Sequence, residues 1–453
     1  MLPLNRSRSR SRFFPVGVPS APTDPFWSDV SLLLNTTSTN GAQNNTFLDS
    51  SANAFSVTRN GNTTQGTFNP FPPSAGAAWS ASTNGGSGYF DGAGDYLSAA
   101  GNTAFDFGTG DFTVEAWVYL PATQTQFAVI ACQASTGNAW YLSFGTGNTV
   151  TFSNYATSYI TSSSAVSNNT WSHVAVSRSG TSLKMFINGA EVGSATNSVS
   201  LGVTANLFVG FNSATQYFNG YLSNFRIVKG TAVYTANFTP PTAPLTAITN
   251  TSLLLNFTNA GIYDSAAKND LETVGNAQVS TTQAKWGATS MAFDGTGDWL
   301  PVIDKPVLRF GTGAFTVEGW LYLGATGAAR GIVGKGTSTT GWLLSTDASD
   351  KVVFTYGTST IVSTGALSGS TWYYIAVVRE GTGANQTKIY INGTNDGTGT
   401  VSTDFNQTSI MYVGANRTGG DALNGYIDDL RITNGVARYT GNFTPPTAAF
   451  PLN

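Results

Sequence analysis

The chain has 453 residues, of which 41% are hydrophobic and 10% charged, and its formal net charge is −3. This balance argues against nucleic acid as a general partner, because phosphate binding needs a broad basic face. No stretch approaches the roughly 18–20 apolar residues of a membrane span, and the single cysteine, Cys132, excludes an internal disulfide. Asn, Thr, Ser and Gly carry most of the polar surface, which favours strands and turns over helices.

The first 29 residues are predicted to form an extended arm that has no counterpart later in the chain. The arm contains four arginines that alternate with serine, followed by a proline-rich stretch; they are Arg6, Arg8, Arg10 and Arg12. It lacks the apolar segment of roughly 7–15 residues that a signal peptide needs, so we expect no signal peptide. Four positive charges are too few for tight binding of nucleic acid but suit an acidic protein surface. We therefore expect residues 1–29 to anchor the chain to a larger assembly.

From residue 30 onwards the sequence contains the same module twice. The phrase FDGAGDYL at 90–97 returns as FDGTGDWL at 293–300, and each module ends in a similar NFTPPTA segment. A repeat of this length exceeds the roughly 20–50 residues of a solenoid unit, so it indicates a duplicated domain. The predicted domains cover residues 30–246 and 247–453, joined by a short linker.

Within each module, apolar and polar side chains alternate with a period of two, which predicts β-strands. In the segment 112–119 both faces are largely apolar, which indicates a strand inside a two-layer sandwich. Asn188-Gly189 and Asn392-Gly393 lie between apolar runs and predict hairpins with type I′ turns. Many short strands and no convincing amphipathic helix predict an all-β fold of two tandem jelly-roll β-sandwiches.

The two copies differ mainly in their loops. The first module carries about 18 more residues than the second, around positions 62–79. Loops that diverge on a shared scaffold often carry function. We therefore expect the attachment specific to this protein in the arm and in this insertion.

The order of the sequence phrases that both copies share resembles that of the laminin-G-like, concanavalin A-like jelly-roll family. The matching phrases include FTVEAWV and FTVEGWL, WSHVAVSR and WYYIAVVR, and NGYLSNFRI and NGYIDDLRI. This resemblance covers nearly all of residues 30–453 and implies two concanavalin A-like sandwiches. It also implies a binding function, mostly toward glycans and sometimes toward proteins, although fold alone does not determine function.

A tandem of such modules behind a short basic head is similar to virion proteins of tailed bacteriophages. This resemblance implies a capsid decoration or fibre-like protein that assembles in the host cytoplasm as part of a symmetric particle. Its partners would be other virion proteins, through residues 1–29, and glycans of the host surface. A bacterial surface adhesin or carbohydrate-binding accessory module is the alternative, and it predicts a secretion route. A glycoside hydrolase is a third interpretation.

The strand acid Glu115 and its twin Glu318 are the candidates for glycoside hydrolysis. That reaction needs two carboxylates about 5–9.5 Å apart, but Trp117 stands two positions after Glu115 and no second acid follows on the strand. We interpret each glutamate as a buried structural acid paired with a strand arginine. The candidate arginines are Arg226 or Arg178 in the first copy and Arg431 or Arg379 in the second.

Two further residues bear on catalysis. Cys132 lies in the apolar run FAVIACQ, which predicts a small buried side chain and not a reactive thiol. His173 is the only histidine, and its twin is Tyr374. The second module therefore has no histidine base for Ser-His-Asp or Cys-His chemistry, and we predict no catalytic residue in either module.

Two pairs of aspartates are candidate metal ligands. They are Asp91 and Asp95 in the first copy and Asp294 and Asp298 in the second. The family resemblance implies a structural Ca²⁺, which is the one cofactor that we consider. Asp-Gly also marks a turn, and two acids supply few of the six to eight oxygens that Ca²⁺ takes. Both interpretations stay open, and no other cofactor is predicted.

Aromatic residues in variable loops are candidate glycan contacts, because exposed rings stack on sugars. The candidates are Phe68, Phe71, Tyr155, Tyr159 and Tyr217. Packing within the loops, or contact with a neighbouring subunit, is the alternative for each ring.

Overall fold

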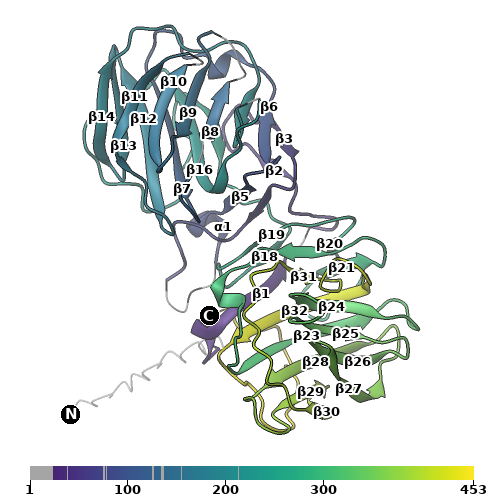
Figure 1. Cartoon of the computed structure of the whole chain (residues 1–453). Helices are drawn as coiled ribbons and strands as arrows, with labels where there is room; N and C mark the ends of the chain where they lie inside the picture. The colour runs from purple at the N-terminus through teal and green to yellow at the C-terminus, as the bar shows by residue number, and fades with distance from the viewer. Residues whose placement is uncertain are drawn as a thin grey trace, which may run out of the picture.

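The computed structural model describes residues 24–452 except 38, 75, 76, 78, 125, 126, 134–136, 155 and 213. The predicted anchoring arginines Arg6, Arg8, Arg10 and Arg12 therefore lie outside the described residues, as does Tyr155. The described chain forms two β-sandwiches (Figure 1). Its helical segments are short, namely α1 (Ala81–Asn84) and the 3₁₀ turns η1 (Trp27–Asp29), η2 (Thr103–Phe105) and η3 (Pro306–Leu308). The predicted all-β fold is confirmed.

The first sandwich consists of two facing sheets, ordered β11-β10-β9-β8-β15-β6-β3-β2 and β14-β13-β12-β7-β16-β5-β4, with β17 beside β16. Its strands are β2 (Phe47–Leu48), β3 (Ser56–Asn60), β4 (Thr64–Gly66), β5 (Ser87–Asp91), β6 (Tyr96–Ala99), β7 (Phe112–Tyr119), β8 (Ala128–Gln133), β9 (Trp140–Phe144), β10 (Thr149–Asn154), β11 (Ser158–Ala165), β12 (Trp171–Ser179), β13 (Ser182–Ile187), β14 (Ala190–Thr196), β15 (Leu207–Val209), β16 (Asn219–Lys229) and β17 (Thr251–Leu255).

The second sandwich repeats this plan with sheets β18-β1-β32-β23-β28-β29-β30 and β19-β22-β31-β24-β25-β26-β27; β21 lies beside β32, and β20 lies beside β21. Its strands are β1 (Val30–Thr36), β18 (Ile262–Asp264), β19 (Asp270–Leu271), β20 (Gln278–Ser280), β21 (Ser290–Asp294), β22 (Leu300–Val302), β23 (Phe315–Leu323), β24 (Arg330–Lys335), β25 (Trp342–Thr346), β26 (Lys351–Tyr356), β27 (Ser359–Ala366), β28 (Trp372–Arg379), β29 (Thr387–Ile391), β30 (Thr394–Gly399), β31 (Met411–Val413) and β32 (Asn424–Asn434).

The two copies exchange their opening strands. The purple strand β1 lies in the lower body of Figure 1, where Leu33 pairs with Arg431 of β32. Strand β17, which follows the first module in the chain, pairs with β16 of the first sandwich, and Leu254 lies opposite Arg226. The predicted limits 30–246 and 247–453 instead assign each opening strand to the module that follows it. The exchange is possible because VSLLLN and TSLLLN are nearly identical and fit the same slot in the same register.

The exchange also changes the predicted arm. Residues Asp24–Asp29 precede β1 as residues 245–250 precede β17, so this part of the arm does have a counterpart, namely the linker between the modules. These six residues therefore stand before β1 where the linker stands before β17. Their place in the fold is determined by the strand that follows them.

The two sandwiches are joined by hydrogen bonds at their junction. Asn44 lies on the segment that leads from β1 back to the first sandwich, and its Nδ2 donates to the carbonyls of Ile262 (2.7 Å) and Leu271 (2.8 Å). Strand β4, from the insertion around 62–79, pairs with both β5 and β19. The insertion therefore bridges the two bodies of this chain.

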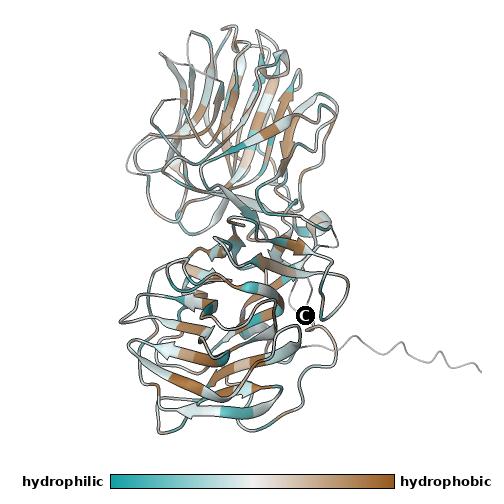
Figure 2. Cartoon of the chain, turned by 90° about the vertical axis from the view of Figure 1, so that its right-hand side faces the viewer, coloured by the Kyte–Doolittle hydropathy of each residue, from teal (hydrophilic) through white to brown (hydrophobic). Residues whose placement is uncertain are grey.

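Each sandwich has its own aromatic core, and Figure 2 shows hydrophobic positions recurring along the strands of both bodies. In the first, Phe107 stacks on Phe112 at 4.2 Å and on Trp140 at 5.2 Å. In the second, the equivalent rings of Phe310, Phe315 and Trp342 stack at 4.4 Å and 5.3 Å. The duplication therefore extends to side-chain packing. Burial of each such ring stabilises the fold by roughly 1.5–3 kcal/mol.

The predicted type I′ hairpins are confirmed in both copies. Asn188 and Gly189 have φ values of 50° and 77°, and Asn392 and Gly393 have 49° and 79°. A Cβ atom at Gly189 would lie 1.9 Å from the carbonyl oxygen of Phe238, so the turn needs glycine there for space as well as for its φ angle. Among the described residues, no helix is long and apolar enough to cross a membrane.

Candidate functional site

Glu115 is a buried structural acid, as predicted. Its Oε1 accepts hydrogen bonds from Arg226 Nε (2.9 Å) and Nη2 (2.6 Å), and its Oε2 accepts one from the hydroxyl of Tyr234 (2.8 Å). His173 Nε2 lies 3.0 Å from the same Oε2. Burial raises the pKa of Glu115, but the bond from His173 and the charge of Arg226 outweigh burial and lower this pKa overall. The carboxylate is fully buried, so it does not contact a ligand.

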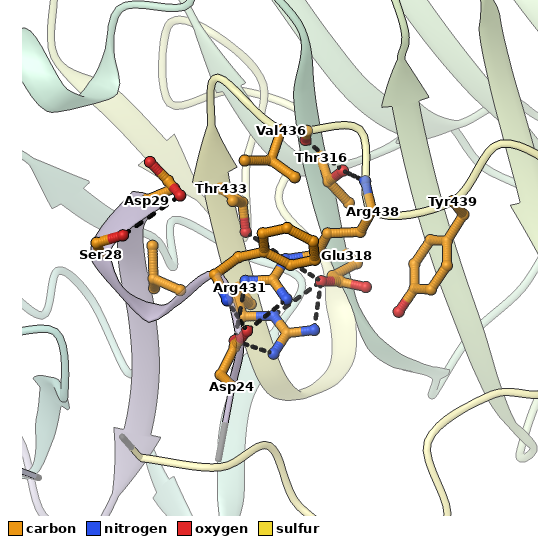
Figure 3. Close-up of polar contacts among 12 residues, drawn as sticks. Asp24, Ser28, Asp29, Thr316, Glu318, Arg431, Thr433, Val436, Arg438 and Tyr439 are labelled. Carbon is orange, nitrogen blue, oxygen red and sulfur yellow. Dashed lines mark hydrogen bonds and ion pairs between the residues drawn. The ribbon is translucent and has the colours of Figure 1, made fainter. Parts of the chain in front are cut away.

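The twin acid Glu318 has the same role. Its Oε1 accepts from Arg431 Nε at 2.8 Å, and its Oε2 accepts from the hydroxyl of Tyr374, which replaces His173. Figure 3 shows a second arginine, Arg438, beside this pair, and Asp24 facing both guanidinium groups. Both glutamates are thus neutralised by the strand arginines Arg226 and Arg431. This pairing leaves neither acid available for glycoside hydrolysis.

The other two candidate arginines bind backbone oxygens. Arg178 Nη2 donates to the carbonyls of Gly108 (2.6 Å) and Gly110 (2.7 Å), and Arg379 Nη2 donates to Gly311 (2.6 Å). These two arginines therefore fix the loop that precedes the central strand of each sandwich. They are not partners of the buried glutamates.

The aspartate pairs hold turns. Asp95 Oδ2 accepts from the backbone N–H of Asp91 (3.0 Å), and its Oδ1 accepts from that of Asn62 (2.7 Å). Asp298 accepts from Asp294 (2.7 Å) in the same way. Burial raises the pKa of Asp95 to about 6. Among the described residues, no three Asp, Glu, His or Cys side chains cluster as metal ligands. Each pair supplies only two carboxylates of the six to eight oxygens that Ca²⁺ takes, and the role that their contacts show is in the turns.

A groove of about 790 Å³ lies on the outer face of the sheet formed by β9, β10 and β11. Trp140, Leu142 and Phe144 of β9 point into the core, so the alternate residue Tyr141 lies on the outer face of the sheet, where it is 6% exposed at the floor of the groove. None of its described lining residues is charged; they are Phe127, Tyr141, Thr151, Ser153, Asn154, Ala156, Thr157, Ser158, Asn212, Ala214, Thr215 and Gln216. The groove therefore offers rings, hydroxyls and amides without formal charge.

Two asparagines shape the walls of the groove. Asn212 Oδ1 accepts hydrogen bonds from the backbone N–H groups of Ala214, Thr215 and Gln216, each at 3.0 Å. Asn154 Oδ1 accepts from the next loop in the same manner, at 3.0 and 2.6 Å. Such bonds between an Asn side chain and the following backbone stabilise tight loops. Both walls are therefore fixed by the side chains of their own first residue.

An aromatic stack supports one wall from below. Phe211 stacks on Tyr217 at 4.7 Å and on Tyr96 at 4.6 Å. Cys132 Sγ donates to the carbonyl of Phe211 at 3.2 Å, and burial raises the pKa of this thiol. The predicted burial of Cys132 is confirmed, and the residue supports the loop of Asn212 from the strand beneath it.

The predicted glycan-contact rings have different places. Phe68 packs 4.9 Å from the ring of Tyr221, with Lys305 Nζ 3.6 Å above it, so it lies in the junction between the sandwiches. Phe71 packs edge-on against Trp117 at 5.6 Å. Tyr159 packs against the core. Of the described candidates, only Tyr217 lies on a loop of the groove, and Phe211 covers one face of its ring.

Most residues of the groove were missed by sequence reasoning. Their signal was the alternation in the segments 140–144 and 149–154, which separates Tyr141, Thr151 and Ser153 from the core residues between them. That alternation identifies an outward face but does not show that loops from elsewhere rise beside it. The meeting of the 154 and 212 loops is a tertiary property.

The second sandwich differs at the equivalent place. In the first sandwich Trp140 pairs with Asn154, and in the second the equivalent Trp342 pairs with Tyr356. The side chain of Tyr356 packs against the core. Leu343 follows Trp342 where Tyr141 follows Trp140. The second copy thus has a tyrosine packed against the core where the first has the amide of Asn154, and a leucine where the first has Tyr141.

Solved structures with a similar fold include the LG4-5 domains of the mouse laminin alpha1 chain, at 13% identity and TM-score 0.27, covering 72% of this chain and 82% of that one. Domain 4 of AbnA, a GH43 extracellular arabinanase from Geobacillus stearothermophilus in complex with arabinotriose, is 20% identical with TM-score 0.31, covering 45% and 94%. The binding domain of botulinum neurotoxin serotype G is 11% identical with TM-score 0.32, covering 85% and 92%.

No curated protein matches the sequence. The family model described as the concanavalin A-like lectin/glucanases superfamily (Laminin_G_3) matches twice, at residues 91–233 and 294–438. These matches fall on the two copies of the repeat and together cover more than half of the chain. The chain therefore belongs to the concanavalin A-like lectin/glucanase superfamily, as a tandem of two laminin-G-like domains.

Proposed function

We propose that the chain is a non-enzymatic virion protein of a tailed bacteriophage, either a capsid decoration or a fibre-like protein. Residues 1–29 anchor it to other virion proteins in a symmetric particle that assembles in the host cytoplasm. The two sandwiches are displayed for attachment to glycans of the host surface. Membership of a lectin superfamily supports the binding role, and the basic arm supports the anchoring.

The observation that carries the binding role is the uncharged groove of the first sandwich. Its volume of about 790 Å³ falls within the range of roughly 300–1,000 Å³ for small-ligand sites. Sugar hydroxyls both donate and accept hydrogen bonds, which matches the amides of Asn154, Asn212 and Gln216 and the hydroxyls around them. The partly exposed ring of Phe127 offers an apolar surface of the kind on which sugar rings pack.

The saturated carboxylates support a function without catalysis. Glu115 and Glu318 are fully buried, and each is bound by a strand arginine and a tyrosine hydroxyl or histidine. Hydrolysis of a glycoside needs two carboxyl groups that reach the same bond. The groove, in contrast, is lined by described residues without a carboxylate.

A glycan array probed with the full chain tests the binding role. Thr151→Val gives the groove the residue that the second sandwich has at Val353, and we expect about tenfold weaker binding from loss of one hydrogen bond of roughly 1–1.5 kcal/mol. Thr355→Val changes the second sandwich at a half-buried strand position and is the matched control. Equal effects of the two variants, or an array without any bound glycan, would contradict the binding role.

Purified particles test the virion role. We expect the chain to be present in virions, and we expect deletion of residues 1–23 to release it. This deletion keeps Asp24 and η1, which belong to the described fold. Absence of the full chain from purified virions would overturn the virion role, whatever the glycan array shows.

A further inference from the structure

The N-terminal segment of the described chain is bound to the second sandwich. Asp24 Oδ2 accepts from Arg431 Nη1 at 2.8 Å, and Arg438 donates to both oxygens of Asp24 at 2.9 Å (Figure 3). The Asp24 side chain is only 1% exposed, so these ion pairs are shielded from solvent. Burial raises the pKa of Asp24, but the bonds from Arg438 and Phe26 lower it overall. The carboxylate is therefore held in its charged form at neutral pH.

The strand that follows strengthens this attachment. Strand β1 lies between β32 and β18, so both of its edges are paired within the second sandwich. Lys268 Nζ donates to the carbonyl of Ser28 (3.1 Å) and also to that of Val30. Asp264 Oδ1 accepts from the backbone N–H of Leu33 at 2.9 Å. The chain from Asp24 to Thr36 is thus held by side chains and strands of the second sandwich.

The first sandwich has no equivalent place for an acid. The residue equivalent to Arg438 is Val233, as the phrases GVARYTG and GTAVYTA show. Arg226, the equivalent of Arg431, donates its Nη1 to the backbone carbonyl of Thr246 at 2.9 Å. The two-arginine site for Asp24 therefore exists only in the second sandwich.

The groove lies on the other body. Strands β4 and β19 pair where the sandwiches meet, and Figure 1 shows β9, β10 and β11 in the upper part of the first sandwich, away from that junction. The described chain begins at Asp24, on the second sandwich, and 23 residues of the arm precede it. The attachment of the arm and the groove are therefore on opposite bodies of the molecule.

We infer that the second sandwich, although it comes later in the sequence, stands next to the assembly that holds the arm, and that the first sandwich is the outer body. The surface around Asp24 on the second sandwich is then the side that faces another virion protein. The inference rests on the proposed anchoring by residues 1–29. Chain order alone predicts the reverse arrangement, with the first module nearest to the arm.

Cleavage at the two segments that connect the bodies tests which one the arm holds. One protease site is inserted after Asn40, which is exposed, and another after Thr258, in a chain with an affinity tag at its N-terminus. After cleavage at both sites, the bound material is washed with increasing urea. We expect the fragment of the first sandwich to elute first and the fragment from 259 onwards to stay with the tag.

The opposite order of elution would overturn the inference, because it would place β1 in the first sandwich. Elution of both fragments together would also overturn it, since the arm would then hold neither body selectively. Asp24→Asn should lower the urea concentration at which the second sandwich elutes. Asp29→Asn, an exposed acid on η1, is the matched control and should leave that concentration unchanged.

The same double cleavage on purified virions tests the orientation in the particle. We expect the first sandwich to be released and the second to stay with the particle. Retention of the first sandwich and release of the second would overturn the inference. Virions that lack the chain altogether would overturn the proposed function, while the tag experiment would still report which body the arm holds.

Discussion

Replacement of Asp429 by asparagine should stabilise the protein at neutral and alkaline pH. Asp429 is 7% exposed, and its Oδ2 accepts from the backbone N–H of Phe450 at 2.8 Å. Burial and the neighbouring charge of Asp428 raise its pKa from 3.8 to about 7. The equivalent residue of the first sandwich is already an asparagine, Asn224, whose Oδ1 accepts from Leu245 at 2.8 Å. Both residues have a φ near 50°, a conformation that asparagine tolerates well.

The magnitude follows from linkage between protonation and folding. A raised pKa in the folded state means that the contribution of Asp429 to stability is full below pH 3.8 and is lost as the pH rises through 7. At 1.36 kcal/mol for each pKa unit, ionisation of this group costs at most about 4 kcal/mol above pH 7. We expect Asp429→Asn to recover up to about 4 kcal/mol at pH 8 and only about 1.6 kcal/mol at pH 5, because the loss grows by 1.36 kcal/mol per pH unit between pH 3.8 and 7. For a domain of this size, the melting temperature should rise by roughly 5–10 °C at pH 8.

Urea unfolding of the wild type and Asp429→Asn between pH 5 and 8.5 measures this difference. Other buried acids, such as Asp95 and Asp270 with pKa values near 6, titrate in both proteins and cancel in the comparison. The reciprocal variant Asn224→Asp is the control, and it should lose stability as the pH rises. A stability difference that stays constant from pH 5 to 8.5 would refute the reasoning, because it would show that Asp429 does not titrate in this range.

Three further outcomes are expected. Glu115→Gln should destabilise the first sandwich by about 3 kcal/mol in urea unfolding, because it leaves Arg226 buried without its counter-charge; an unchanged unfolding midpoint would contradict the structural role. EDTA should leave the melting temperature unchanged. A lower melting temperature that Ca²⁺ restores would show that a metal binds at the turns of Asp91 and Asp298. Cleavage at a protease site inserted at the exposed Ile248 should leave the two fragments together in gel filtration, since each fragment supplies a strand to the other's sheet. Fragments that elute separately would contradict the exchange of β1 and β17.

The sequence predicts the fold well because the repeat and the strand period are local signals. The Asn-Gly hairpins, the buried glutamates and the alternation of β7 all follow from residues close together in the chain. The exchange of β1 and β17 could not be predicted in this way. Their phrases are nearly identical, so the sequence of either strand fits either sheet, and the choice depends on contacts outside the strands.

The residues of the groove could not be predicted from the sequence either. Loop aromatics such as Phe68 and Phe71 are natural candidates in a sequence, yet the insertion that carries them folds back onto the strand aromatics Trp117 and Tyr221. Asn212 is an ordinary loop residue until its loop lies beside that of Asn154. Which aromatic or amide is available to a ligand is decided by long-range packing, which a period or a motif does not encode.

The contacts outside the strands also explain why the exchange has one preferred direction. In an unexchanged chain, Asp24 would precede β1 in the first sandwich, where Val233 stands in place of Arg438. Arg438 would then face the linker without Asp24, and Asp24 would have Arg226 alone, already bound to Glu115. Without Asp24, the two buried arginines Arg431 and Arg438 would share Glu318 alone, which is unfavourable, whereas the matched strands contribute about equally in both arrangements. The choice between the near-identical strands β1 and β17 therefore depends on the unfavourable charges that the unexchanged arrangement would leave unpaired. The difference between Arg438 and Val233 is the source of these charges.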